Sequence, residues 1–229
     1  MNKESNLYTI VYSVIVVVVV AVMLAYTSET LQPRQAENIA IDKIRQILIS
    51  INIESSHVDA ERLFGKYVVD SYLVDSRGEK VPGDAFKTEL AGELSKPAPE
   101  RRYPVFEADI DGNRKYVLSV RGTGLWGPIW GFISLDDDKN TVYGVSFEHE
   151  GETPGLGAEI NQHHFENKFI GKKFFNTENK FVSIAVVKPG KSAQGQDYVD
   201  GISGGTITSQ AVDAMLKSSI GAYEMFLRK

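Results

Sequence analysis

The chain has 229 residues, a net charge of −5 and no cysteine. The absence of cysteine excludes disulfides, thiolate zinc sites, iron–sulfur clusters and a cysteine nucleophile, so any redox chemistry must come from an organic cofactor or a partner. The acidic balance and the lack of a long Lys/Arg run exclude the electrostatic footprint of a nucleic-acid-binding protein.

A short N-terminal tail, residues 1–6, precedes twenty residues without a charge, Leu7 to Tyr26. At 1.5 Å per residue, a helix of this length covers the ~30 Å hydrocarbon core of a bilayer. The alternative is a cleaved signal peptide, but the apolar run exceeds the ~7–15 residues of an h-region and no clear A-x-A site follows. We therefore expect a retained transmembrane helix over 7–26. Lys3 before the span and Arg34 after it leave its orientation open.

Residues 27–100 are predicted to be rich in helix. Pro33 to Ser50 places apolar residues at helical spacing, and Pro33 suits the first turn of a separate helix. A short helix opened by Ser55 or Ser56 is expected over Val58 to Lys66.

A strand is predicted next, because Tyr67 to Asp75 is rich in β-branched and aromatic residues. Asp84 to Ser95 is predicted to form another helix. The segment 96–104 carries three prolines and breaks regular structure, so we place an internal boundary there and begin the C-terminal domain at residue 101.

Residues 101–229 are predicted to form one domain. Its expected strands are Val105–Ala108, Lys115–Arg121, Ile129–Leu135, Thr141–Phe147 and Phe181–Val187. Ser209 to Leu227 has one apolar stripe, as expected for a helix that packs on a sheet. The expected fold class is α+β, with a single N-terminal transmembrane helix followed by a domain that has an antiparallel sheet and packed helices.

Residues 122–127 read GTGLWG and match the G-x-G-x-x-G dinucleotide fingerprint. A strand follows instead of a helix, and no βαβ unit surrounds the match, so we interpret it as a glycine-rich connection between strands. Trp126 and Trp130 either fill the core or flank a planar ligand.

Residues 148–159, EHEGETPGLGAE, combine four carboxylates with one histidine. The functional readings are a carboxylate pair for acid/base chemistry or a metal site built on His149, and the simpler reading is a solvated acidic turn. A loop this rich in glycine does not fix ligand geometry, so we predict no metal site. The pair His163-His164 is interpreted as surface or core residues.

The stretch DGISGGTITS, residues 200–209, precedes the last predicted helix. Thr206 is internal, which excludes an N-terminal threonine nucleophile, and Ser203 lacks a G-x-S-x-G elbow. Small residues expose backbone N–H groups, and a helix that begins near Ser209 points its positive end at the loop, which favours a phosphate site. The simpler alternative is a glycine turn in which Thr208 or Ser209 caps the helix.

The same stretch resembles the flavinylation motif of periplasmic FMN-binding domains, D-x-x-[ST]-G-[AG]-[ST]. The resemblance implies that a flavin transferase attaches FMN through its phosphate to the hydroxyl of Thr206. Asp200 and the small residues Ser203, Gly204 and Gly205 would be read by the transferase, and Thr208 would complete the phosphate cradle. Alanine is commoner than Gly205 in the motif, a departure that loosens the loop but keeps the acceptor hydroxyl.

Three further stretches resemble the C subunit of the bacterial sodium-translocating NADH:quinone oxidoreductases. They are Gly124-Leu125-Trp126, Gly151 to Gly157, and Leu31 to Gln35 after a single span, and the resemblance covers nearly the whole chain. It implies that five residues surround the isoalloxazine ring: Leu125, Trp126, Glu152, Thr153 and Leu156.

The resemblance also implies an inner-membrane protein whose soluble domain is periplasmic and whose N-terminal tail is cytoplasmic. The chain would be a one-electron relay in a membrane complex, while other subunits oxidise NADH, reduce quinone and move sodium. It would therefore carry no complete active site and no catalytic residue of its own. A single span without an internal charge offers no ion pathway, which agrees with this division of labour.

Two alternatives stay open. The G subunit of the ferredoxin:NAD oxidoreductase complex shares the motif and the single span, although the segment Pro33 to Gln35 favours the C subunit of the sodium pump. A membrane-anchored module without a redox role would use the glycine loop to bind a free phosphate ligand.

Overall fold

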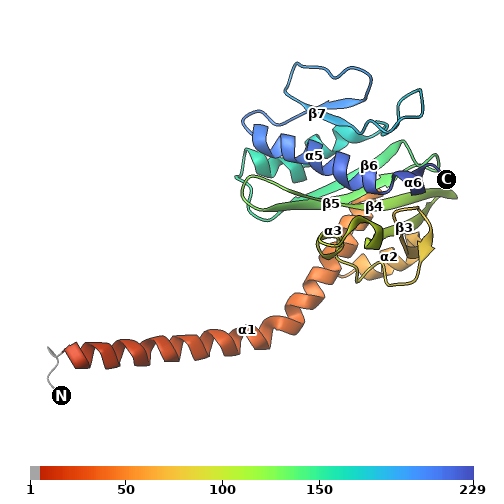
Figure 1. Cartoon of the computed structure of the whole chain (residues 1–229). Coiled ribbons are helices and arrows are strands. Elements are labelled where there is room, and N and C mark those ends of the chain that lie inside the picture. The colour runs from red at the N-terminus through yellow and green to blue at the C-terminus, as the bar shows by residue number, and fades with distance from the viewer. Residues whose placement is uncertain (1–5) are drawn as a thin grey trace. The chain divides into compact units, whose positions relative to one another are not determined.

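The computed structural model describes residues 6–229 (Figure 1). The N-terminal tail expected over residues 1–6, with Lys3, lies outside the described residues except for Asn6. The chain divides into two compact units, one up to Lys43 and one from Ile44 to Lys229. The first unit is helical throughout its described part, and the second holds the sheet and every cavity considered below.

The first helix, α1, runs from Asn6 to Ser50. The prediction that Pro33 opens a separate helix is wrong, because Pro33 lies inside α1. Proline removes one N–H donor from the helix, yet the residues on both sides favour helix strongly enough for the ladder to continue. Among residues 6–229, α1 is the one helix that is long and apolar enough to cross a membrane.

The second unit contains a six-stranded antiparallel sheet in the order β2-β1-β3-β4-β5-β6. Its strands are β1 (Val68–Val74), β2 (Lys80–Val81), β3 (Tyr103–Ile110), β4 (Asn113–Thr123), β5 (Pro128–Leu135) and β6 (Val142–His149). The predicted strands at β1, β3, β4, β5 and β6 are confirmed to within a few residues. The α+β class is confirmed as well.

The strand predicted over Phe181–Val187 is only partly right. Regular structure is confined to β7 (Ala185–Val187), which pairs in parallel with β8 (Tyr198–Asp200) outside the main sheet. Ser183 has a left-handed φ of 66°, which interrupts the extended chain before β7. Phe181 instead forms an isolated antiparallel bridge with Phe175.

The short helices differ more from the expectation than the strands do. They are α2 (Ala60–Tyr67), α3 (Leu90–Leu94), α4 (His163–Glu166) and the 3₁₀ turns η1 (Ala98–Glu100), η2 (Gly157–Asn161) and η3 (Asn167–Phe169). The helix predicted over 84–95 is wrong in its first half, because the Asp84 carboxylate accepts the N–H groups of Phe86 and Lys87 and holds a turn there.

The proline-rich segment 96–104 is a connection within the sheet. β1 lies before it in the chain, β3 begins within it at Tyr103, and these two strands are hydrogen-bonded neighbours. The division into a helix-rich part, 27–100, and an FMN-binding domain, 101–229, remains a prediction.

The core lies between one face of the sheet and the helix α5 (Thr206–Ala222), which a short helix α6 (Glu224–Leu227) follows. Because side chains alternate between the two faces of a strand, the row Val105, Leu118 and Ile133 faces this core. Figure 1 shows α5 lying along this face. The next row, which includes Phe106, faces α2 on the other side, where the rings of Phe64 and Phe106 are 6.4 Å apart.

Two contacts hold α5 tightly against β4. The Ser219 hydroxyl accepts the Arg121 N–H and donates to the Arg121 carbonyl, each at 3.1 Å. Gly122 allows the close approach, since a Cβ at this position would lie 2.8 Å from the Cβ of Met215. The register of α5 on the sheet is thereby fixed.

The buried side chain of Glu166 closes the outer edge of β6. One carboxylate oxygen accepts the Phe147 N–H at 2.8 Å, and the other lies 3.3 Å from Nδ1 of His163. Burial raises the pKa of Glu166 to about 7, and the nearby charge of Glu148 adds to the rise, while the Phe147 N–H and His163 oppose it. The carboxylate supplies the acceptor that a further strand would otherwise supply.

Stability should depend on pH through this group. Its pKa rises from 4.5 to about 7 on folding, so its contribution is complete below about pH 4.5 and is lost as pH rises through about 7. Glu166→Gln keeps the acceptor and removes the charge. We expect the variant's free energy of unfolding, relative to the wild type, to rise by up to about 3 kcal/mol between about pH 5 and about pH 8.

Urea titrations of the full chain in detergent at several pH values measure this difference. The exposed Glu178→Gln variant is the matched control and should show no such trend. A stability difference for Glu166→Gln that does not change with pH contradicts the assignment.

Candidate functional site

Three segments that are distant in sequence meet at the N-terminus of α5. They are the β4–β5 connection, the loop after β6 and the glycine-rich loop after β8, and they enclose a pocket of about 220 Å³. The pocket is lined by Leu125, Glu152, Thr153, Leu156, Gly157, Gly204, Gly205, Thr206, Ile207 and Thr208.

Most of the predicted site residues line this one pocket, and Asp200, Ser203 and Trp126 do not. Asp200, at the end of β8, and Ser203, in the glycine-rich loop that follows, are both exposed. The side chain of Trp126 is 67% exposed beside the pocket. Gly157 and Ile207 also line the pocket but were not among the residues predicted from the sequence. Ile207 could have been predicted, because it directly follows Thr206.

The start of α5 differs from the sequence prediction. The helix begins at Thr206, not near Ser209, and Gly205 is its N-cap without a side-chain cap bond, so capping by Thr208 or Ser209 is also wrong. Gly204 has a left-handed φ of 79°, which turns the chain directly into the helix. The Ser209 hydroxyl instead accepts the Ile202 N–H at 2.9 Å and ties the glycine loop to the helix.

Thr206 is consequently the first residue of a 17-residue helix, and its side chain is exposed. The first N–H groups of a helix have no acceptor within the helix, and the helix dipole adds partial positive charge at this end. The Thr206 hydroxyl therefore lies where an anionic group is stabilised by the backbone.

The Glu152 side chain joins the walls of the pocket. It is 4% exposed, and its two oxygens accept hydrogen bonds from different segments. The Trp126 N–H donates to Oε1 at 3.0 Å, and the Thr208 hydroxyl donates to Oε2 at 2.6 Å. Although burial opposes it, the bonds from Thr208 and from the backbone at Trp126 hold the pKa of Glu152 below its usual range.

Two glycines make room for this carboxylate. A Cβ at Gly124 would collide with one oxygen of Glu152, and a Cβ at Gly157 would collide with the other and with the Thr208 hydroxyl. One glycine in each of the GTGLWG and GETPGLG stretches thus allows close packing around Glu152. The interpretation of 122–127 as a strand connection is confirmed, since β4 ends at Thr123 and β5 begins at Pro128.

His149, the histidine of the acidic loop, makes a hydrogen bond within that loop. Nδ1 of His149 accepts the Glu152 N–H at 3.3 Å. Within residues 6–229, no three metal-ligating side chains lie close enough together to hold a metal ion. His163 and His164 have side chains that are 70% and 63% exposed, so of the two interpretations, surface or core, the structure supports the surface.

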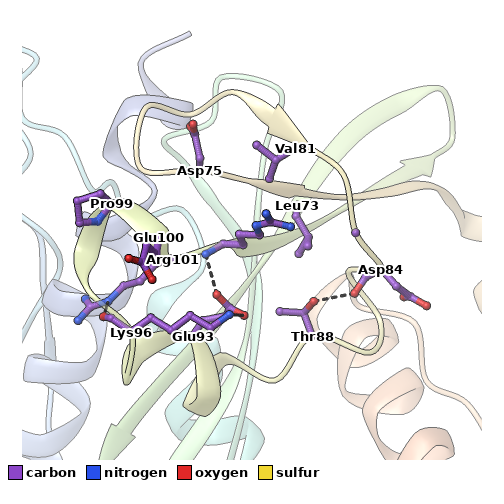
Figure 2. Close-up of a pocket in the computed structure, with 12 residues that line it drawn as sticks. Leu73, Asp75, Val81, Asp84, Thr88, Glu93, Lys96, Pro99, Glu100 and Arg101 are labelled. Atoms are coloured by element: carbon purple, nitrogen blue, oxygen red, sulfur yellow. Dashed lines mark hydrogen bonds and ion pairs between the residues drawn. The ribbon is translucent and has the colours of Figure 1, made fainter.

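A larger cavity, of about 590 Å³, lies between the β1–β2 region and the segment from α3 to β3 (Figure 2). Several of its charged groups are paired within the chain. The Glu93 carboxylate accepts hydrogen bonds from the Lys96 ammonium at 2.7 Å and from the Arg102 backbone N–H at 2.9 Å. Arg101 donates to the Lys96 carbonyl at 2.8 Å. None of the predicted site residues lines it, so the pocket at α5 is the candidate site.

Residues 124–221 match the FMN-binding domain family, a range that contains every residue lining the α5 pocket. The fold and the pocket thus belong to an FMN-binding domain. Over its whole length the chain resembles the C subunit of the Na(+)-translocating NADH-quinone reductase of Pseudomonas aeruginosa, with 30% identity over 252 aligned positions that cover 99% of this chain and 96% of the relative. The chain belongs to the family of these C subunits, and the resemblance inferred from sequence is confirmed.

Solved structures agree with this assignment. The C subunit of the same enzyme from Parabacteroides distasonis is 52% identical, with a TM-score of 0.83, and the match covers 87% of this chain and 98% of that structure. NqrC of Shewanella oneidensis has a TM-score of 0.71 at 23% identity, and the match covers 83% of this chain and 97% of that one. It shows the same fold.

The residues at the pocket fit FMN. The hydroxyl of Thr206 and the start of α5 suit its phosphate. Three apolar side chains at the pocket remain substantially exposed, namely Leu125 (47%), Leu156 (41%) and Ile207 (54%), and they suit a planar aromatic ring.

A methyl group at Gly157 should disturb this pocket selectively. In Gly157→Ala the new Cβ meets a buried carboxylate and a hydroxyl that are bonded to each other, so we expect a loss of about 1–3 kcal/mol in the free energy of unfolding. Gly151→Ala lies in the same loop with nothing within 4 Å of its Cβ and should change stability by less than about 0.5 kcal/mol. Urea titrations followed by tryptophan fluorescence test this, and equal midpoints for the two variants argue against it.

Proposed function

We propose that this chain is a covalent flavoprotein subunit of a sodium-translocating NADH:quinone oxidoreductase, with FMN esterified through its phosphate to Thr206. The observation that carries the proposal is the exposed Thr206 residue at the N-terminus of α5, which lines a pocket together with Gly204 and Gly205 of the flavinylation motif. Membership of the C-subunit family supports the assignment to this complex.

Attachment requires a flavin transferase and a flavin dinucleotide donor. The Thr206 oxygen forms a bond to the phosphorus that bears the flavin, the bond from this phosphorus to the bridging oxygen of the diphosphate breaks, and a nucleoside monophosphate leaves. The hydroxyl proton passes to a base on the transferase. Asp200 and Ser203 are exposed and lie outside the pocket, which supports their being read by the transferase while Thr206 accepts the flavin.

In the flavinylated protein, the cofactor supplies one-electron redox chemistry. The chain's own residues would place it: the free N–H groups at the start of α5 would hold the phosphate end, because the Thr208 hydroxyl is already bonded to Glu152. Leu125, Thr153 and Leu156 would flank the ring beside Trp126. A covalent tether makes tight burial of the ring unnecessary, so an edge stays open for electron transfer to neighbouring centres. NADH oxidation, quinone reduction and sodium movement belong to the partner subunits.

Replacement of the acceptor tests the ester directly. Thr206→Val keeps the shape of the side chain and removes the hydroxyl, so we expect complete loss of flavin fluorescence from the protein band in a denaturing gel. Thr206→Ser keeps a hydroxyl and should retain the band. Both variants must be produced in cells that contain the transferase. A fluorescent Thr206→Val band places the ester elsewhere, and a colourless wild type indicates reversible phosphate binding only.

We propose further that α1 anchors the chain in the inner membrane with the soluble domain in the periplasm and the N-terminal tail in the cytoplasm. Support comes from its twenty uncharged residues over 7–26 and from the periplasmic location of the domains whose motif it shares. Alkaline phosphatase fused after Lys229 should be active, because this enzyme requires an oxidising compartment. Green fluorescent protein fused at the same position should stay dark. The reverse pair of results contradicts this orientation.

A further inference from the structure

The family resemblance implies that Glu152 lies beside the flavin ring, and the hydrogen bonds of its carboxylate indicate a further role. Both carboxylate oxygens already accept hydrogen bonds from the chain, and Glu152 is almost fully buried in the lining of the pocket. Its partners, the Trp126 N–H and the Thr208 hydroxyl, come from the β4–β5 connection and from the first turn of α5. Glu152 therefore connects the two sides of the site.

Both bonds are made entirely between residues of this chain. The bond from the Trp126 N–H to Glu152 is partly buried, and a hydrogen bond to a charged group contributes roughly 1.5–3 kcal/mol, so it favours the arrangement in which Glu152 connects the two segments. Because Thr208 is two residues from Thr206 on the same helical turn, the tie also fixes the acceptor threonine relative to Trp126.

The carboxylate also places a permanent charge at the pocket. Its hydrogen bonds favour the ionised form, as the lowered pKa of Glu152 indicates. A fixed negative charge in a partly desolvated wall disfavours the addition of electrons to a neighbouring group. Glu150, in the same loop, is exposed, and solvent screens its charge far more effectively.

We propose that Glu152 is a positioning residue that holds the two walls of the flavin pocket together and whose charge lowers the reduction potential of the bound flavin. The effect on the reduction potential rests on the proposed function, whereas the role of Glu152 in holding the pocket walls together does not.

Two substitutions separate the two effects. Glu152→Gln can accept the Trp126 N–H and donate to the Thr208 hydroxyl, so it keeps the tie and removes the charge. Glu152→Asp keeps the charge, but its shorter side chain cannot reach both donors.

The first measurement is the midpoint potential of the flavinylated full chain in detergent, titrated spectroscopically. We expect Glu152→Gln to raise the potential and Glu152→Asp to leave it closer to that of the wild type. Glu150→Gln is the matched control, with the same charge change in the same loop, and should shift the potential less. An unchanged potential in Glu152→Gln overturns the electrostatic role.

The second measurement is hydrogen exchange at the Trp126 amide in the full chain produced without the transferase, which needs no flavin. We expect protection in the wild type and in Glu152→Gln, and at least tenfold faster exchange in Glu152→Asp. Thr208→Val offers a second route should a Glu152 variant fail to fold, and it should also speed exchange because one end of the tie is removed.

Equal exchange rates in all of these chains overturn the positioning role. A wild-type protein that carries no flavin would contradict the proposed function alone. The exchange experiment would still report on the hydrogen bonds that Glu152 makes to Trp126 and Thr208.

Discussion

The packing of α5 against β4 is the constraint on which the site depends. A helix on a sheet can slide or rotate unless specific contacts prevent it. Here the Ser219 hydroxyl pairs with both backbone groups of Arg121, and Gly122 lets Met215 approach the strand closely. Once the helix is fixed at this end, its N-terminus has one position relative to the loop that leaves β4.

The pocket follows from that position. β4 continues into the connection that carries Leu125 and Trp126, so the strand that holds α5 also presents one wall of the site. The loop after β6 supplies the second wall, because β6 is paired with β5 and its end lies beside the same connection. Glu152 then links the walls through Trp126 and Thr208. A rigid framework thus positions an acceptor residue that itself stays exposed.

Much of the fold could be predicted from local sequence patterns. The short runs of β-branched and aromatic residues in Lys115–Arg121 and Ile129–Leu135, bounded by turn residues, identified β4 and β5. The parallel pairing of β7 with β8 could not be predicted, since each strand has three residues and the pairing depends on contacts across a ten-residue loop, 188–197. The early start of α5 depends on the left-handed conformation of Gly204, which sequence permits but does not require.

In the site, too, some features could be predicted from the local sequence and others depend on the assembled fold. The motif around Thr206 is contiguous in sequence and was recognised from it, whereas the function of Glu152 depends on two partners from distant segments. Within the acidic loop, nothing in the local pattern distinguishes Glu152 from Glu150, yet one is buried and bonded while the other is exposed. Burial and pairing are properties of the assembled fold, so such roles become visible only in the structure.

The central claim is that this framework presents Thr206 as the attachment point of FMN. Tandem mass spectrometry of the peptide that contains residues 200–209, taken from the full chain expressed together with the transferase, tests it most directly. The account predicts a mass increase equal to FMN minus one water, located on Thr206. An unmodified peptide, or the same increase located on Ser203 or Thr208, would contradict it.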